Sequence, residues 1–446
     1  MNERAEKILK AFRENKAYME DRIQSGIEAH RKGWATIRVV DTEGNTVENA
    51  ALKIRQKTHD FKFGANCFML DELETEEKNE TYKQHFAKLF NLATLPFYWA
   101  DLEPQPGNLR FEKDSPKRYR RPAPDLCLEY CEKHGIEPKL HCLVYEQWSP
   151  TWLPMDVPTV KRLLDQRIAQ IAERYKDKIP TMEVINETLC GEKDRPERHT
   201  TRFFREPDIV EWSFEHARKY LPANTLIINE ATDHCWSRGF KYNRSAYYMQ
   251  IERALFKGAS IDSVGMQFHA FYRREDEEKM TKLLYDPKQL FRVMDQYADF
   301  GKPLQVTEVT IPAYSWEEED EAVQAELLTN LYKIWFSHPN MEAIIYWNLT
   351  DGYAAYAEPG DMSYGENYYH GGLMRFDMTP KPAFYALDEL INKTWRTNLD
   401  ATAENGSLEL KGFYGTYEIE VTAGGKTSTQ TVHLEKDADN HFTIII

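Results

Sequence analysis

Cysteine is scarce in this sequence, with six residues among 446. That number is too small for a disulfide scaffold. Cys127 and Cys131 lie four apart, but no second ligand pair follows at the spacing of a zinc site. We therefore expect buried free thiols and no bound metal or other cofactor. Free thiols also favour a reducing compartment.

A surplus of positive charge and a long apolar run are lacking as well. The net charge is −15, which argues against a nucleic-acid partner because no basic surplus is present to neutralise phosphates. No run of about eighteen apolar residues is available to span a membrane. The charged start Met1–Arg4 does not resemble a secretory signal. We expect a cytoplasmic protein; a secreted protein whose signal has been removed is the alternative.

A glycine-rich phosphate loop is missing after the first strand of the long central region, where Phe63–Cys67 stands instead. Eight apolar segments alternate in this region with amphipathic stretches such as Thr159–Tyr175 and Glu318–Phe336. Strands that alternate with helices pair in parallel, and eight of them favour a closed (β/α)8 TIM barrel over an open sheet. The predicted strands are Phe61–Phe68, Leu92–Trp99, Pro138–Tyr145, Met182–Glu187, Leu226–Glu230, Val264–His269, Leu304–Val309 and Ile344–Asn348.

The two ends of the chain have a different pattern. Residues 1–31 have apolar residues at helical spacing and predict an N-terminal helix. Residues 32–58 and 405–446 show strand-like alternation and turn signals, and predict one small β module built from both ends. The barrel then occupies residues 59–400. For the module we favour a capping role over glycan binding, which would need exposed rings at Phe413, Tyr414 and Tyr417.

Candidate functional residues follow from the barrel prediction, because active sites of such barrels lie at the C-terminal ends of the strands. Carboxylates, imidazoles and indoles gather at these ends, and a purely structural barrel has no need of them. The aromatic content of 13% also fits a cleft whose rings stack on sugars, although a large aromatic core explains it equally well. The strand-end residues are Asn66, Trp99, His141, Tyr145, Asn186, Glu187, Asn229, Glu230, Gln267, His269, Glu308, Trp347 and Asn348.

Glu187 and Glu308 form the strongest pair among these residues. Glu187 comes at the end of the fourth strand and Glu308 lies on the seventh, and these strands lie nearly opposite each other across a small barrel mouth. Glycoside hydrolysis needs one protonated and one ionised carboxyl on either side of the bond. We expect a carboxyl separation of about 5–5.5 Å, and hence retention of configuration. Glu230 is the rival acid/base residue, ranked lower because the fifth and seventh strands lie nearer the same side.

Neighbouring residues suit the same chemistry. Asn186 can bind a sugar hydroxyl, His269 can orient Glu308, Gln267 can brace the adjacent strand end, and Trp347 offers a flat platform for the cleaved sugar. Taken singly, core packing of Trp347 and buried structural roles for the polar residues explain each of them as well.

The motifs resemble glycoside hydrolase family 10, whose best-known members are endo-β-1,4-xylanases. By this resemblance Glu187 is the acid/base and Glu308 the nucleophile, while His141, Asn186, Gln267, His269 and Trp347 surround the subsite beside the cleaved bond. The resemblance covers roughly residues 59–395, with these motifs: Phe61–Gly64, Phe90-Asn91, Trp99, Glu103–Gly107, His141–Tyr145, Pro150, Trp152, Val184–Glu187, Ile261–His269, Val306–Val309, Trp347, Asp351 and Lys381–Phe384.

The chain also departs from the family pattern. Family xylanases carry Glu-Asn and a Lys after the second strand that grip the sugars on the non-reducing side, and Thr94–Trp99 holds no such residues. At the third strand, Tyr145, Glu146 and Trp148 replace the usual Trp-His and Gln. Glu146 is therefore a further candidate for sugar binding, or a rim hydrogen-bonder. The tyrosine-rich loop 353–370 should overhang the cleft, where it could supply stacking, block one end or simply pack on the surface.

Three functions remain open from the sequence. The first is a retaining hydrolase of β-1,4-linked xylan or xylo-oligosaccharides, without a cofactor. The second keeps the mechanism but acts on another β-linked glycan, and the third is a non-catalytic carbohydrate-binding protein on the same scaffold. All three have an oligo- or polysaccharide partner. The sequence does not reveal the oligomeric state.

Overall fold

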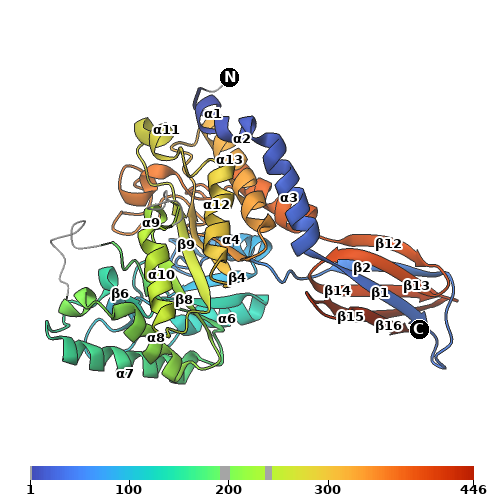
Figure 1. The fold of residues 1–446 in the computed structure, drawn as a ribbon, viewed down its shortest axis with the longest axis horizontal. Helices are drawn as coiled ribbons and strands as arrows, with labels where there is room; N and C mark the ends of the chain where they lie inside the picture. The colour runs from blue at the N-terminus through green and yellow to red at the C-terminus, as the bar shows by residue number, and fades with distance from the viewer. Residues whose placement is uncertain (1–2, 191–200, 237–243) are drawn as a thin grey trace.

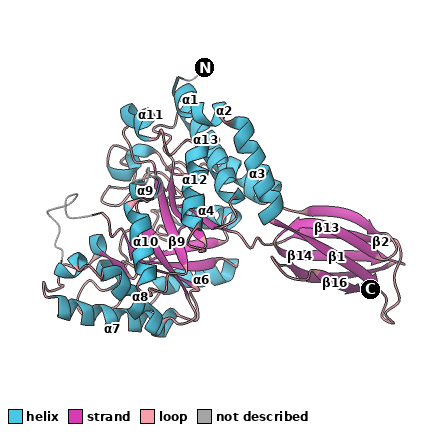
Figure 2. Ribbon diagram, viewed as in Figure 1, coloured by secondary structure: helices cyan, strands magenta, loops and turns pink. Residues whose placement is uncertain are grey.

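The computed structural model describes residues 3–190, 201–236 and 244–446. It consists of a barrel of strands surrounded by helices and a separate β-sandwich that projects from one end of the barrel (Figure 1; Figure 2). Both chain ends contribute to the sandwich, so the chain passes through it before and after building the barrel.

The barrel strands close into a ring with eight positions, all paired in parallel. The third position is shared by two short strands, β5 and β6, which both pair with β7. Every residue of β4, β7 and β10 is buried, as expected for parallel strands covered on both faces. The strands are β3 Lys62–Asn66, β4 Leu92–Pro96, β5 Glu137–His141, β6 Val144–Tyr145, β7 Thr181–Asn186, β8 Thr225–Glu230, β9 Ser263–His269, β10 Leu304–Thr310 and β11 Met341–Tyr346.

Amphipathic helices cover the outside of the ring (Figure 2). Helix α7 shows why they begin where they do: the Asp156 side chain accepts the N–H of Thr159, and Pro158 lies in the first turn. The main helices are α4 Glu76–Leu89, α6 Pro124–His134, α7 Val157–Tyr175, α8 Ile209–Tyr220, α10 Ala246–Phe256, α12 Pro287–Ala298, α13 Glu318–Ser337 and α14 Pro382–Glu389, and the shorter ones are α5 Trp99–Leu102, α9 Thr232–Trp236 and α11 Glu277–Met280.

This arrangement confirms the predicted (β/α)8 barrel with an accessory β module. Among the described residues, no helix combines the length and apolarity needed to cross a membrane. All six cysteines are free thiols, and Cys190 alone among them is not fully buried.

The N-terminal segment is helical but interrupted twice, whereas the sequence predicted one helix over residues 1–31. The helices are α1 Glu3–Ile8, α2 Lys10–Glu14 and α3 Lys16–His30, and residues 1–2 lie outside the described part of the chain. Asn15 separates α2 from α3, and its side-chain amide donates a hydrogen bond to the carbonyl oxygen of Ala11. Helix α3 packs against α13, so this segment covers the barrel.

The sandwich has two facing sheets, in the orders β13-β1-β16 and β12-β2-β14-β15. Its core lies between the sheets and includes Ile37, Ile54 and Ile419. Phe413 and Tyr417 are buried, so two of the three rings that a glycan-binding face would need are not exposed. The strands are β1 Lys32–Val40, β2 Ala50–Gln56, β12 Asn398–Ala403, β13 Ser407–Phe413, β14 Gly415–Ala423, β15 Lys426–Leu434 and β16 His441–Ile445; β12 starts within the range predicted for the barrel.

Candidate active site

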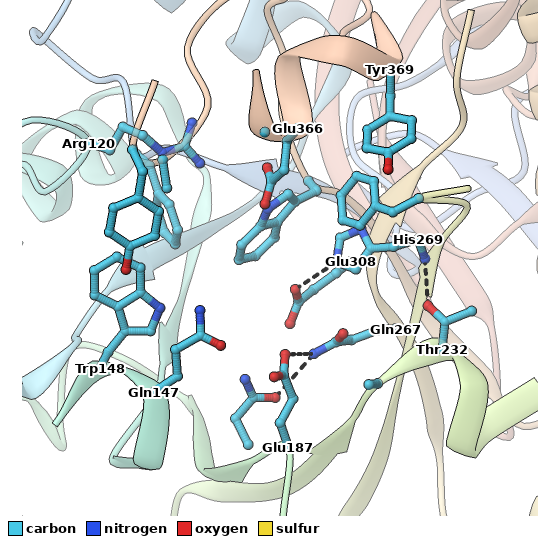
Figure 3. Close-up of a pocket in the computed structure, with 18 of the residues that line it drawn as sticks. Arg120, Gln147, Trp148, Glu187, Thr232, Gln267, His269, Glu308, Glu366 and Tyr369 are labelled. Carbon is cyan, nitrogen blue, oxygen red and sulfur yellow. Dashed lines mark hydrogen bonds and ion pairs between the residues drawn. The ribbon is translucent and has the colours of Figure 1, made fainter. Parts of the chain in front are cut away.

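A cavity of about 860 Å³ opens at the C-terminal ends of the barrel strands (Figure 3). Its volume lies at the upper end of the range usual for ligand pockets. Asn229 lies just behind the cavity lining and contacts it through Glu308. Eight of the predicted site residues line the cavity: His141, Tyr145, Asn186, Glu187, Gln267, His269, Glu308 and Trp347.

Glu187 is the first residue after β7 and has a left-handed backbone, with φ of 53°. This conformation is uncommon for a residue with a Cβ atom and marks a position that the surroundings hold in place. The carboxylate accepts two hydrogen bonds, from the Tyr145 hydroxyl at 2.7 Å and from Gln267 Nε2 at 3.0 Å. Donors on two different strands therefore fix its direction at the mouth.

Glu308 lies within β10 and is only 4% exposed. Its Oε1 accepts a hydrogen bond from Asn229 Nδ2 at 2.9 Å, and its Oε2 lies 3.0 Å from His269 Nε2. Burial raises the pKa of Glu308 to about 8, and the positive charge of His141 acts against this rise. The Glu308 carboxyl therefore holds a proton at neutral pH.

Three amides connect the two carboxyls across the mouth. Gln267 Nε2 contacts both Glu187 Oε1 and Asn186 Oδ1, the latter at 3.3 Å. Asn229 Nδ2 contacts the same Asn186 oxygen at 3.0 Å and reaches Glu308 on its other side. Since the oxygen of Asn186 accepts both bonds, its NH₂ group is left for a ligand. The chain of amides brings Glu187 and Glu308 into one site.

The contacts of its two ring nitrogens make His269 a hydrogen-bond donor to Glu308. Burial lowers its pKa to about 4, so the ring is neutral at neutral pH. Its Nδ1 lies 2.9 Å from the Thr310 hydroxyl. When this nitrogen accepts the Thr310 proton, Nε2 carries the hydrogen and donates to Glu308.

A buried charged group below the mouth was missed from the sequence. Glu183 points inward from β7 and contacts His141 Nδ1 at 2.7 Å and Lys139 Nζ at 3.0 Å. Burial disfavours the charged form of His141, but the Glu183 carboxylate outweighs it and raises the His141 pKa. His141 Nε2 then lies 3.0 Å from the Tyr98 hydroxyl at the cavity. The pattern of β7 gave no signal for Glu183, because the strand is buried throughout and shows no polar alternation.

Trp347 follows β11 and lines the cavity. Phe68, His141 and His269 all contact its ring at steep angles, with interplanar angles of 75°, 78° and 75°. Such edge contacts hold the indole from the sides. This support suits a flat platform in the cleft.

Other strand-end residues have structural contacts. Glu230 is fully buried, accepts the backbone N–H groups of Ala231 and Leu189, and is absent from the cavity lining. Burial raises its pKa to about 7. Glu146 also lies outside the lining, where it forms an ion pair with Arg205 at 2.9 Å. Its predicted contact with substrate stays a prediction.

Loop residues complete the lining, and single-sequence reasoning found few of them. The predicted overhang of loop 353–370 brings Tyr356, Glu366 and Tyr369 to the cavity. Arg120 and Arg121 come from the long connection between β4 and α6, on the side where the family's grip residues are missing. Their signal was the basic run 117–121, which sequence reasoning left unused.

Comparison with known proteins agrees with this geometry. The model of "Glycosyl hydrolase family 10" matches residues 53–390. The anti-sigma-I factor RsgI6 of Acetivibrio thermocellus is 24% identical, covering 91% of this chain and 47% of the relative. Endo-1,4-beta-xylanase B of Thermotoga neapolitana is 23% identical, covering 70% of this chain and 84% of the relative. The endo-1,4-beta-xylanase 2 of Arabidopsis thaliana is 22% identical, covering 88% and 32%.

Solved structures show the same fold. Native xylanase 10B from Thermotoga maritima superposes with a TM-score of 0.57 at 20% identity, covering 75% of this chain and 96% of that chain. The chain spans less than half the length of RsgI6 and of the Arabidopsis relative. Since the family model matches more than half of the chain, the protein belongs to glycosyl hydrolase family 10.

Proposed function

We propose that the chain is a retaining hydrolase of β-1,4-linked xylan or xylo-oligosaccharides. Family membership supports a glycoside hydrolase, and relatives named endo-1,4-beta-xylanase support xylan as the substrate class. The observation that carries the proposal is the chain of amides Gln267, Asn186 and Asn229, which joins the two carboxyls across the barrel mouth.

In the first step Glu308 attacks the anomeric carbon while Glu187 gives its proton to the leaving oxygen. The C–O bond to the leaving sugar breaks and a glycosyl ester forms on Glu308. The hydrogen bonds from Asn229 and His269 stabilise the negative charge of Glu308 once its proton has left. The proton that Glu308 holds must therefore pass to Glu187 before the attack.

In the second step Glu187 removes a proton from water, which attacks the same carbon and releases Glu308. The Tyr145 hydroxyl can change its hydrogen-bond acceptor as Glu187 changes from acid to base. Burial raises its pKa, so its hydroxyl stays a donor. The hydroxyl lies 2.7 Å from Glu187 and 2.9 Å from Gln147 Oε1. It donates to ionised Glu187 and turns to Gln147 when Glu187 holds the proton.

An activity screen tests the proposal. Wild-type protein and Glu308→Gln are assayed on xylan, xylo-oligosaccharides and a panel of aryl β-glycosides. We expect hydrolysis of the β-xylosides by the wild type and loss of turnover in the variant. Binding without turnover on every β-glycoside would instead favour a non-catalytic carbohydrate-binding protein.

A second candidate keeps the mechanism but changes the sugar. Arg120 and Arg121 line the cleft on the side where family xylanases carry their Glu-Asn and Lys grip. Because these arginines differ from the family's Glu-Asn and Lys, the substrate of this chain could be another β-linked glycan. In the same screen, a higher kcat/KM on a different aryl β-glycoside than on the β-xyloside would support this candidate.

A further inference from the structure

Two stacked rings from separate loops stand on one side of the cleft. Trp148 belongs to the short turn Glu146–Trp148 after β6, and Tyr356 to the loop after β11. Their ring centroids are 5.3 Å apart and the rings are nearly parallel, at 6°. In the barrel, β3 and β4 lie between these two strands. The stack therefore spans the mouth above the ends of β3 and β4.

Neighbouring side chains contact the stack, and the backbone of Tyr356 has an unusual conformation. Tyr98, two residues after β4, also stacks on Trp148, with ring centroids 5.0 Å apart. The Arg121 guanidinium lies 4.3 Å from the Tyr98 ring and 4.4 Å from the Trp148 ring, and Asp101 fixes it at 2.9 Å. Tyr356 has a φ of 63°, a left-handed conformation that a tyrosine adopts only where the loop enforces it. The loops are thus shaped to join over the cleft.

Behind the stack lies a polar group that faces the cavity (Figure 3). Arg120 donates to Asn348 Oδ1 at 3.0 Å, and Asn348 Nδ2 donates to Glu366 Oε2 at 2.8 Å. Both Arg120 and Glu366 line the cavity. Arg120 is only 3% exposed, and its Nε–H has no acceptor among the described residues. Arg120 and Glu366 are thus joined through Asn348 into one polar group beside the cavity.

The place of the stack in the barrel gives the direction. Phe68 contacts Trp347 at 5.3 Å and Tyr98 at 5.8 Å, so the stack is linked to the predicted sugar platform. In family xylanases the residues that grip the non-reducing sugars follow the second barrel strand, and the stack lies above the ends of β3 and β4, the first and second barrel strands. We therefore place the stack on the non-reducing side. On the opposite side the cavity lining includes Asp233 and Arg273, both exposed to solvent.

We propose that the cleft ends in a closed subsite for the non-reducing terminal sugar, with Trp148 and Tyr356 as its wall and Arg120 and Glu366 as its polar contacts. The chain then removes short units from the non-reducing ends of β-1,4-xylo-oligosaccharides and seldom cuts within a long chain. This inference rests on the proposed function for the sugar that it names.

A product analysis tests the mode of cleavage. Xylohexaose labelled at its reducing end and polymeric xylan are given to the wild type, Tyr356→Ala and Trp148→Ala. Tyr385→Ala, an exposed tyrosine on α14, serves as the control. The wild type should release one short unlabelled product first. Removing either wall ring should raise kcat/KM on xylan relative to xylohexaose by about tenfold, as expected when a steric block in a pocket is lost.

The product analysis can also contradict the closed subsite. Random internal cleavage by the wild type, with product patterns and rate ratios unchanged in Tyr356→Ala, would overturn the closed subsite.

A binding measurement separates this inference from the proposed function. In Glu308→Gln protein, calorimetry compares xylotetraose with xylotetraose that carries a bulky group on O4 of its non-reducing sugar. A closed subsite predicts that the capped ligand binds about tenfold more weakly, because its bulky group would clash with the Trp148–Tyr356 stack. Adding Tyr356→Ala should restore its affinity.

Equal binding of the two ligands refutes the closed subsite even where the wild type hydrolyses xylan. Rejection of the capped ligand by a protein that turns over no β-glycoside supports the subsite and refutes the proposed function.

Discussion

Glu187 and Glu230 both follow an asparagine at the end of a barrel strand, but their surroundings differ. Glu187 lines the cavity and accepts hydrogen bonds from Tyr145 and Gln267. Glu230 is fully buried and accepts backbone N–H groups outside the lining. The local sequence could rank the two residues as acid/base candidates but could not exclude Glu230, since its burial depends on how the loops after the strands fold.

The two glutamates make a matched pair of variants. Glu187→Gln should lower kcat by about 10²- to 10⁴-fold, because the acid/base proton is lost. Glu230→Gln should keep kcat but lower the free energy of unfolding by about 1–3 kcal/mol, since its NH₂ group would face one of the two backbone N–H donors. Kinetics on an aryl xyloside and urea unfolding of both variants check this. A larger kcat loss in Glu230→Gln would reverse the assignment.

The raised pKa of Glu308 predicts the pH dependence of activity. Burial raises the pKa of Glu308 to about 8, against an ordinary glutamate value of 4.5. Below this pH Glu308 holds a proton that can pass to Glu187 for donation to the leaving group, and above it that proton is lost. The alkaline fall of kcat/KM should therefore have its midpoint near 8. A fall that begins near pH 5 would contradict this environment for the pair.

At the scale of elements, α1 is tied to the loop that follows β10. Arg4 makes two hydrogen bonds of 2.8 Å to the Glu277 carboxylate and one of 2.9 Å to the carbonyl oxygen of Pro312. Both Arg4 and Glu277 side chains are largely buried. The N-terminal helices therefore stabilise the region next to the strand that carries Glu308.

Removal of this anchor gives an element-scale prediction. Arg4→Ala leaves Glu277 buried without its main partner and should lower the free energy of unfolding by about 3–5 kcal/mol. Lys7→Ala on the same helix loses only exposed pairs with Glu3 and Glu278 and should change little. Thermal unfolding of both variants checks the difference. Equal melting temperatures would show that α1 contributes nothing to the barrel.

Elements with a strong periodic pattern could be predicted, and those shaped by tertiary contacts could not. The strands Leu304–Thr310 and Thr181–Asn186 are fully buried and were found within one residue of their ends. Strand β12 was missed because most of its residues are exposed and no apolar alternation marks it. Trp148 and Tyr356 meet through two loops, and no local pattern predicts how such loops fold.

For the whole molecule, the sandwich packs at the end of the barrel opposite to the cleft. Phe413 of β13 contacts His59 at 5.8 Å and Phe336 at 6.1 Å, close to where β3 and β11 begin. Arg31 adds hydrogen bonds to the carbonyl oxygens of Phe336, His338 and Met341. These contacts support the capping role over a direct part in substrate binding.

This arrangement predicts separate effects on stability and activity. Phe413→Ala should lower the free energy of unfolding by about 3–5 kcal/mol, because a buried ring at the junction is removed. Its kcat/KM at 25 °C should stay that of the wild type, since the cleft is at the far end. Calorimetry and steady-state kinetics check both. A loss of kcat/KM in folded Phe413→Ala would show that the sandwich affects the site.

The first sugar released is the most direct test of the central claim that Glu308 and Glu187 act by double displacement. Proton NMR can follow the anomer formed from an aryl β-xylobioside before mutarotation. Two inversions at the same carbon predict that the β-anomer appears first. First appearance of the α-anomer would contradict the assignment of Glu308 as nucleophile.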